Sequence, residues 1–253
     1  MIAKTQKDIQ GVRAAGKALG EVLAILAGLV APGTPASELD LRAEEEIRRR
    51  HALPAFLGYR PDDAAYPYPA TLCVCINDEV VHGIPTEDKI LQEGDIVMLD
   101  LGLSLDGYFA DSAITVSVGP ADEKTTRLLN ATREALSVAV QTAKVGNTMG
   151  DIGAAVEAVA KKYGYKTAEN LGGHALGKKP HEPPYIPNIG PAGSGEEIEE
   201  GMVLAIEPIF TEGSGRITLD ADEWTYRTAD GTRSCEFEHT VLITKDGAEI
   251  LTK

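Results

Sequence analysis

Apolar residues recur at helical spacing in four segments of the chain. The first two predicted helices cover residues 5–29 and a segment that begins with Thr34 as its cap and Pro35 as its first residue. The other two cover residues 122–144 and 150–163. Each half of the chain is therefore expected to open with a pair of helices.

The second predicted helix carries acidic and basic residues four positions apart. The pairs are Glu44–Arg48, Glu45–Arg49 and Glu46–Arg50. Opposite charges at this spacing stabilise the exposed surface of a helix, so we expect a solvated face here.

Short apolar runs bounded by turn residues predict the strands. They cover residues 71–76, 96–116, 202–210 and 235–243. Segments 60–69 and 187–195 are rich in Pro together with Asp, Ala or Gly and are predicted to be loops.

The longest strand segment contains Asp106-Gly107, which is a strong signal for a two-residue hairpin turn. With these two residues in the turn, Leu105 faces Tyr108 and Gly102 lies opposite Asp111. Asp100 is two residues from Gly102 and therefore points to the same face of the sheet as Asp111.

Two carboxylates on one face of an otherwise apolar hairpin are unfavourable. Asp100 and Asp111 repel each other, and removing them from water adds a further cost. A solvated strand face is the alternative interpretation for the hairpin alone. A cation between the two carboxylates would remove both costs.

Two segments, one in each half of the chain, resemble each other. Residues 93–100 and 200–207 both have Glu-Gly, then a short apolar run, then a carboxylate at the seventh place after the first Glu. Chance similarity between two short strands is the alternative. If the repeat is real, a pseudo-twofold axis would bring Asp100 and Glu207 to the same central place.

Composition and charge restrict the class of protein and its partners. The chain has 253 residues, of which 43% are hydrophobic and 25% are charged, and its net charge is -15. These values fit a globular protein of one large or two small domains, and the acidity argues against nucleic-acid binding or a polybasic membrane patch.

The cysteines and the apolar stretches bear on the cellular compartment. Three cysteines and no secretory leader fit a reducing cytoplasm. The longest apolar stretch, near residues 22–30, is too short to span a bilayer.

Further carboxylates and one histidine extend the candidate site. Glu207 follows four apolar residues in a predicted core strand, where a carboxylate is costly unless it is paired or ligated. Alternation places Glu236 and Glu238 on one face, and only one of them need be a ligand while the other is solvated. His174 lies between small residues that would let the backbone come close to a site.

Five sequence motifs, taken together and in this order, are typical of one known family. They are Asn77-Asp78-Glu79-Val80-Val81-His82-Gly83-Ile84-Pro85, the Asp100/Asp111 hairpin, Gly173-His174 with His181-Glu182, Ile206-Glu207-Pro208, and Phe237-Glu238-His239-Thr240. Over essentially its whole length the chain resembles a type I methionine aminopeptidase of the pita-bread metallopeptidase superfamily. The resemblance implies an α+β fold with a curved, mainly antiparallel sheet covered by helices, an internal pseudo-twofold, and a single catalytic domain over residues 1–253.

The resemblance also implies a set of ligands for two divalent metal ions, which are Asp100, Asp111, His174, Glu207 and Glu238. Four carboxylates carry a charge of -4, which two divalent ions would neutralise. One imidazole among four carboxylates is a hard donor set that suits manganese, iron(II) or cobalt at least as well as zinc.

The activity implied is removal of the N-terminal methionine from peptides and new proteins. Two ions about 3.5–4 Å apart would activate a shared water for attack on the first peptide bond. Glu207 would move the proton of the water to the leaving amine, His181 would stabilise the oxyanion, and His82 would hydrogen-bond the scissile amide.

The methionine side chain needs a slender apolar pocket, where sulfur–aromatic contacts help. By resemblance Tyr59, Tyr68, Cys73 and Trp224 line it, with ordinary core packing as the alternative for each. The chain departs from the family pattern near this pocket, with Ala175, Pro180, Phe56 and an insertion-like loop between Tyr59 and Tyr68.

Two other functions remain open at this point. The nearest is a proline-specific aminopeptidase or dipeptidase of the same fold, although such enzymes usually carry a large additional N-terminal domain. The other is a catalytically inactive binding protein, although such proteins lose ligands. The type II methionine enzyme is disfavoured because it has a long insertion in its C-terminal half.

The partners implied by the resemblance are the N-termini of peptides and nascent chains. This includes chains still on the ribosome, although the sequence shows no zinc-finger or Pro-rich extension that would dock there. No nucleic-acid or membrane partner is expected, and a monomer is the simplest expectation.

Overall fold

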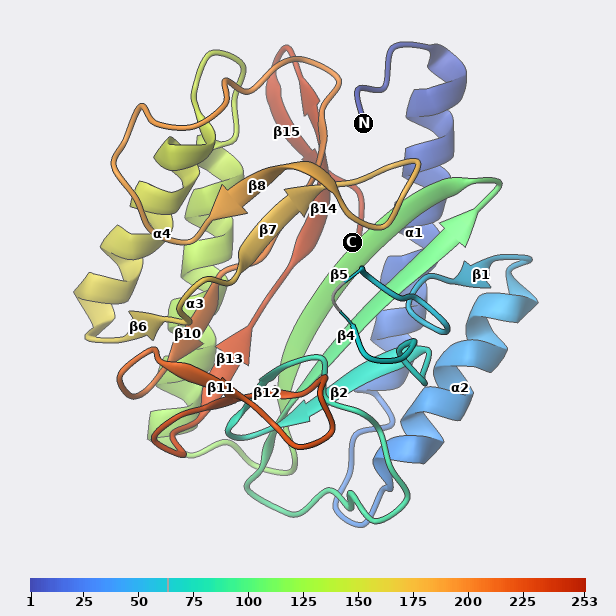
Figure 1. Ribbon diagram of the computed structural model, residues 1–253, viewed down its shortest axis with the longest axis vertical. Coiled ribbons are helices and arrows are strands. Elements are labelled where there is room, and N and C mark those ends of the chain that lie inside the picture. Colours follow the sequence, from blue (N-terminus) through green and yellow to red (C-terminus); the bar gives the residue numbers. More distant parts are fainter. Residues whose placement is uncertain (63) are drawn as a thin grey trace.

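A computed structural model describes residues 1–62 and 64–253. Its helices are α1 (Gln6–Ala27), α2 (Ala36–Arg49), α3 (Glu123–Thr142) and α4 (Met149–Tyr163). Figure 1 shows α1 and α2 on one side of the molecule and α3 and α4 on the other, with the strands between and in front of them. The four predicted helices are therefore confirmed, and their predicted ends lie within two residues of the observed ones.

The strands of the described chain are short apart from one hairpin. They are β1 (Leu53–Pro54), β2 (Leu72–Ile76), β3 (Glu79–Val81), β4 (Ile96–Leu105), β5 (Tyr108–Ser117), β6 (Lys166–Thr167), β7 (Gly172–Ala175), β8 (Glu182–Pro187), β9 (Val203–Ile206), β10 (Ile209–Thr211), β11 (Ile217–Leu219), β12 (Tyr226–Thr228), β13 (Ser234–Glu236), β14 (His239–Thr244) and β15 (Gly247–Ile250).

These strands pair in four groups. One has the order β1-β4-β2 with β5 also on β4, and another has the order β15-β14-β9-β7-β8. Two smaller groups have the orders β13-β10-β6 and β11-β12-β3. Every pairing between named strands in the described chain is antiparallel, which confirms the expected α+β class.

The central hairpin has the predicted register. Leu105 pairs with Tyr108 and Gly102 pairs with Asp111. Asp106 and Gly107 both have positive φ, at 51° and 77°, as a two-residue turn that matches strand twist requires. The hairpin is local in sequence, and its register depends on the turn alone.

Two predicted strands are interrupted at a carboxylate. Segment 202–210 divides into β9 and β10, and the break falls at Glu207-Pro208 because proline has no N–H for the ladder. Segment 235–243 divides into β13 and β14 at Phe237-Glu238. At each break the backbone of the acidic residue is bound outside its own ladder, because Asn188 Nδ2 donates to the Glu207 carbonyl and the Glu238 amide donates to the Ala113 carbonyl, both at 2.9 Å.

The start of α2 differs from the prediction. Thr34 does not cap the helix, because Pro35 is the capping residue and the hydroxyl of Thr34 donates to the carbonyl of Leu29. The reason is tertiary. Residues 33–36 pair with residues 89–91, where the amide of Ala36 donates to the carbonyl of Lys89.

The second half of the chain repeats this contact. Gly33 donates to the carbonyl of Leu91, and Gly146 donates to that of Ile198, at 2.7 and 3.1 Å. The bridge between Pro35 and Ile90 likewise has a counterpart between Thr148 and Glu197. Both contacts precede the repeated Glu-Gly strands, so the echo in the sequence corresponds to a repeated local structure.

The hydrophobic core is divided in the same way. Residues of α1 and α2 pack on the β4–β5 hairpin in one cluster, and residues of α3 and α4 pack on β7, β9 and β14 in another. On α2, Glu46 is buried and binds Arg42, Arg49 and Arg50, so the expected solvated face is wrong at this residue. The pair Glu44–Arg48 lies on the surface as predicted.

The two predicted loops are confirmed in the described residues, apart from Pro187, which is the last residue of β8. Within segment 60–69, the described residues contain no helix or strand, as expected for a loop. Among residues 1–62 and 64–253, no helix combines the length and the apolar character needed to cross a bilayer.

Close backbone approach at Gly173 yields a stability prediction. A Cβ at this position on β7 would lie 2.2 Å from the carbonyl oxygen of Ala205 on β9. Because that atom belongs to the backbone of a paired strand, Gly173→Ala is expected to lower the free energy of unfolding by about 1–3 kcal/mol. Chemical denaturation followed by circular dichroism measures it.

The control is Gly28→Ala, at the end of α1, where φ is -69° and the nearest atom to a Cβ lies 3.4 Å away. This variant is expected to be as stable as the parent or slightly more so. Equal stability of the two variants would contradict the close approach at Gly173.

Candidate metal centre and adjoining pocket

A cavity of about 300 Å³ lies where the two halves of the chain meet. Its walls include all eleven residues that the sequence predicts for the site, which are Tyr59, Tyr68, Cys73, His82, Asp100, Asp111, His174, His181, Glu207, Trp224 and Glu238. They come from strands, from residues next to strands and, for Tyr59, Tyr68 and Trp224, from loops, and these segments are far apart in sequence.

The acidic side chains converge on one place within the cavity. Ligand atoms of Asp100, Asp111 and Glu238 lie within 4.8 Å of one another, and so do those of His174, Glu207 and Glu238. Glu238 belongs to both groups and joins them. Asp100 and Glu207 thus face the same cavity, as the repeated segments predict.

Hydrogen bonds across the sheets hold these acids in place. The amide of Asp111 on β5 donates to the hydroxyl of Thr240 on β14 at 2.9 Å, and that hydroxyl donates to the carbonyl of Asp111 at 2.6 Å. The hydroxyl of Ser112 donates to the carbonyl of Glu238 at 2.7 Å. The hairpin thereby fixes the backbone of the C-terminal carboxylates.

His174 presents a lone pair to the carboxylates. Its Nδ1 lies 3.1 Å from the carbonyl oxygen of Ala175, which makes Nδ1 the protonated nitrogen of a neutral ring. Nε2 then faces Asp111 Oδ2 at 3.9 Å and Glu207 Oε1 at 3.7 Å. A lone pair and two carboxylate oxygens without a proton between them form a cradle for a cation.

Burial makes the carboxylates costly without a counter-charge. It raises the pKa of Asp100 to about 7, and burial together with the neighbouring carboxylates raises the pKa of Asp111 and Glu238 well above the usual range. Among the described residues, Asp111 Oδ1 and Glu238 Oε1 have no hydrogen-bond partner. The unpartnered oxygens and the all-oxygen-and-imidazole donor set fit divalent metal ions.

Glu236 is a cavity residue that sequence reasoning left open. Its side chain is 3% exposed and lines the cavity, so the solvated alternative is wrong. The hydroxyl of Thr115 donates to its carbonyl at 2.6 Å and turns the side chain inward. The alternation with Glu238 was the sequence signal that the two side chains share a face. Whether that face is buried depends on β5, which covers both residues.

His82 and His181 both line the cavity. His82 follows β3 with a φ of 57°, and burial, followed by the charge of His181, lowers its pKa to about 4, so it is neutral near pH 7. The ring of His181 lies 4.4 Å from that of His174 and 5.2 Å from that of Tyr59, between centroids.

An apolar pocket adjoins the carboxylate cluster. Phe56, Tyr68, Cys73 and Trp224 pack in one hydrophobic cluster. Cys73 on β2 is the register partner of Asp100 on β4, so the pocket begins one strand away from the acids. An apolar wall therefore lies beside the carboxylates.

Three of the departures from the family pattern can be located in the structure. Ala175 packs in the core of the second half, while its neighbour His174 faces the cavity. Phe56 lines the cavity, in space left by Gly102, whose Cβ would lie 2.8 Å from the Phe56 ring. Tyr66 of the insertion-like loop packs edge-on against Trp224.

Comparison with known proteins agrees with this geometry. The model of metallopeptidase family M24 matches residues 10–245. The chain belongs to this family, which makes it a metal-dependent hydrolase.

The relatives define the class more narrowly. A methionine aminopeptidase from Aquifex aeolicus is 45% identical over 253 residues, covering 98% of this chain and 97% of the relative. Methionine aminopeptidase 1 from Mycobacterium tuberculosis is 40% identical over 251 residues, covering 97% and 92%.

Solved structures show the same fold. The methionine aminopeptidase of Thermotoga maritima superposes with a TM-score of 0.95 at 39% identity over the whole of both chains. The prolidase of Pyrococcus furiosus has a TM-score of 0.78 at 25% identity, covering all of this chain and 65% of that one. The expected pita-bread fold is thereby confirmed.

Protons and metal ions are expected to compete for the buried carboxylates. Asp100 has a folded-state pKa of about 7 and an unfolded pKa of about 3.9, so the metal-free fold binds more protons than the unfolded chain between these values. Stability of the metal-free protein therefore falls as pH rises through about 4 to about 7, and the stabilisation by added metal grows over the same window.

The measurement is thermal unfolding of chelator-treated protein at pH 5.5, 6.5 and 7.5, with and without Mn²⁺. The rise in Tm on adding Mn²⁺ is expected to increase with pH. Sodium chloride at matched ionic strength is the control. A Tm that does not respond to Mn²⁺ at any of these pH values would mean that the cluster is not a metal site.

Proposed function

We propose that the protein removes the N-terminal methionine from peptides and nascent proteins by hydrolysis of the first peptide bond. The observation that carries the proposal is the position of an apolar pocket directly beside a cluster of four carboxylates and one histidine. The relatives named methionine aminopeptidase, which match nearly the whole chain, support the same reaction.

The metal ligands of the proposal are Asp100, Asp111, His174, Glu207 and Glu238. Two divalent ions held there, of manganese, iron(II), cobalt or zinc, would acidify a shared water and polarise the scissile carbonyl. One of the ions would also bind the free amine of the substrate, and a site that requires a free amine acts only at chain ends.

Three side chains of the site have separate roles in proton transfer and hydrogen bonding. The Glu207 carboxylate accepts the proton of the attacking water and passes it to the nitrogen of the leaving amine. His181 donates to the oxyanion that develops on the carbonyl, and His82 hydrogen-bonds the scissile amide. A neutral imidazole can do this because it keeps one N–H donor.

The pocket selects the first residue of the substrate. Tyr68, Cys73 and Trp224 are buried and form apolar walls, and Tyr59 lies at the His181 side of the cavity. An unbranched thioether fits a narrow pocket of this kind and gains contacts between sulfur and aromatic rings.

Two rival functions are not favoured. A proline-specific peptidase shares the fold, but the relatives at 37–45% identity over nearly the full length carry the methionine name. A binding protein without activity would not need five ligand groups, and all five converge here.

We propose further that residues 1–253 act as a single catalytic domain and as a monomer. Its cellular setting is the cytoplasm, where nascent chains, including those on the ribosome, supply the substrate. Net charge of -15 supports the exclusion of nucleic acid from the list of partners.

Cleavage of defined peptides tests the function. With Mn²⁺ or Co²⁺, the protein is expected to release methionine from Met-Ala-Ser and to leave Ala-Pro-Ala intact, because the apolar pocket accepts the methionine side chain. Chromatography of the products gives both rates, and metal content is determined on the same sample. Preference for Ala-Pro-Ala would favour the prolidase-type reaction instead.

Removing one charge from the cluster tests the ligand assignment. Asp111→Asn is expected to lower kcat by about 10²-fold or more and to leave folding largely intact, because the amide is isosteric and a buried charge is removed. Asp106→Asn, in the exposed turn of the same hairpin, is the matched control and should retain full activity. Turnover of Asp111→Asn within a few fold of the parent would refute the metal-ligand role.

A further inference from the structure

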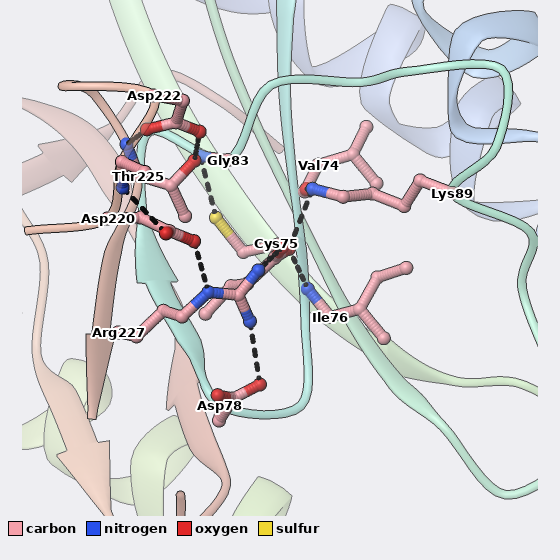
Figure 2. Close-up of polar contacts among 12 residues, drawn as sticks. Val74, Cys75, Ile76, Asp78, Gly83, Lys89, Asp220, Asp222, Thr225 and Arg227 are labelled. Atoms are coloured by element: carbon pink, nitrogen blue, oxygen red, sulfur yellow. Dashed lines mark hydrogen bonds and ion pairs between the residues drawn. The ribbon is translucent and has the colours of Figure 1, made fainter. Parts of the chain in front are cut away.

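An ion-pair network lies behind the cavity wall that carries His82. Arg227 on β12 contacts three carboxylates, with Nε 2.6 Å from Asp220, Nη1 3.0 Å from Asp78 and Nη2 2.8 Å from Glu79. Figure 2 shows the Arg227 guanidinium between Asp220 and Asp78. One side chain thus joins two segments that lie about 150 residues apart in sequence.

Glu79 connects this network to the core of the first half. Its side chain is 4% exposed, and its second oxygen accepts from the amide of Ile76 and from Lys89, both at 2.8 Å. Lys89 also donates to the carbonyl of Val74 at 3.0 Å. A buried carboxylate bound on both oxygens by cations is a rigid anchor, because every alternative position would leave a charge unpaired.

The strand that Glu79 belongs to is short. Besides its ladder, it is held by the hydroxyl of Ser234, which donates to the Glu79 carbonyl at 2.8 Å, and by burial of Val80 and Val81. β3 has three residues and meets β12 at two register positions, Val81 with Tyr226 and Glu79 with Arg227, with a bulge between them. The Arg227–Glu79 ion pair therefore coincides with one of the two contacts in this short ladder.

His82 follows β3 directly and adopts a strained backbone conformation. A φ of 57° is unfavourable for a residue with a side chain and persists only where the surroundings enforce it. On the C-terminal side, the amide of Gly83 donates to Cys75 Sγ at 3.2 Å, and the hydroxyl of Tyr68 donates to the Gly83 carbonyl at 3.0 Å. On the N-terminal side, the anchor is Glu79.

The other segment of the network carries Trp224. The carboxylate of Asp222 accepts from the amides of Trp224 and Thr225 and from the Thr225 hydroxyl, which fixes the turn before β12. The rings of His82 and Trp224 meet edge to face with centroids 6.0 Å apart. The amide-contacting histidine and a wall of the methionine pocket thus touch each other.

We infer that Arg227 and Glu79 are positioning residues whose ion pair holds His82 against Trp224, so that one network sets both the amide contact and the pocket wall. The part of this inference that concerns the role of His82 in the reaction rests on the proposed function. The part that concerns the positions of His82 and Trp224 does not. Without the guanidinium, Asp78 and Asp220 lose this counter-charge and Glu79 keeps only Lys89, so β3 and β12 separate and His82 relaxes from its strained conformation.

The first test uses the only tryptophan of the chain as a local reporter. In metal-free Arg227→Gln, emission of Trp224 is expected to shift to longer wavelength and to be quenched more strongly by acrylamide, because the indole gains contact with water. Arg13→Gln is the matched control, since it removes an equally well-formed pair with Glu249 on the outer face of α1. The control should leave the emission unchanged.

The second test is a double-mutant cycle on peptide cleavage. Arg227→Gln is expected to lower kcat for Met-Ala-Ser by about tenfold to about a hundredfold, with a smaller change in KM, since misplacement of a catalytic group by about 1 Å has effects of this size. In the His82→Ala background the same change should cost less than about twofold, because its effect is exerted through His82. Arg227→Lys should restore part of kcat.

The outcomes separate the inference from the proposed function. Unchanged Trp224 emission in a folded Arg227→Gln protein, or equal losses of kcat in the presence and absence of His82, would overturn the positioning role while leaving the peptidase activity established. A parent protein without cleavage activity would refute the function, and the fluorescence comparison would still decide whether the network holds Trp224. Far-UV circular dichroism confirms that each variant is folded.

Discussion

The accumulation of buried negative charge where the two halves of the chain meet is the constraint on which the site depends. Asp111, Glu236 and Glu238 are each no more than 4% exposed, and Asp100 and Glu207 face the same cavity. Carboxylates so close together in a water-poor cavity cannot all ionise without cations. The fold must therefore hold them against their own repulsion, and metal ions are the partners that make the arrangement favourable.

The architecture supplies that restraint through contacts between distant strands. Thr115 and Thr240 exchange hydrogen bonds with the backbone across β5 and the C-terminal strands, and they are fully buried. Helix pairs on both sides close the two hydrophobic clusters over the strands. The acids thus lie on strands whose positions are determined by packing on both faces, which is the rigidity that a preorganised site requires.

The site is also asymmetric in a way that suits an exopeptidase. One side of the carboxylate cluster opens into the apolar cluster of Phe56, Tyr68 and Trp224, and the other carries His174 and His181. In the proposed reaction, the apolar side would hold the first side chain of the substrate and the histidines would contact its first peptide bond. Behind the cavity wall that carries His82, the Arg227 network also holds a buried charge in place. There the buried carboxylate of Glu79 is fully paired with cations and anchors the strained His82.

Local patterns in the sequence determined the four helices, the hairpin register and the face shared by Asp100 and Asp111, because each depends on neighbouring residues and on one turn. The residue types of the metal ligands could also be predicted from the sequence, and the five proposed ligands all line one cavity. The tertiary structure alone decided that Pro35 rather than Thr34 caps α2, that Glu46 and Glu236 are buried, and that Arg227 meets Glu79. Each of these depends on which distant segment covers the residue. The periodicity of the sequence does not indicate which distant segments lie together.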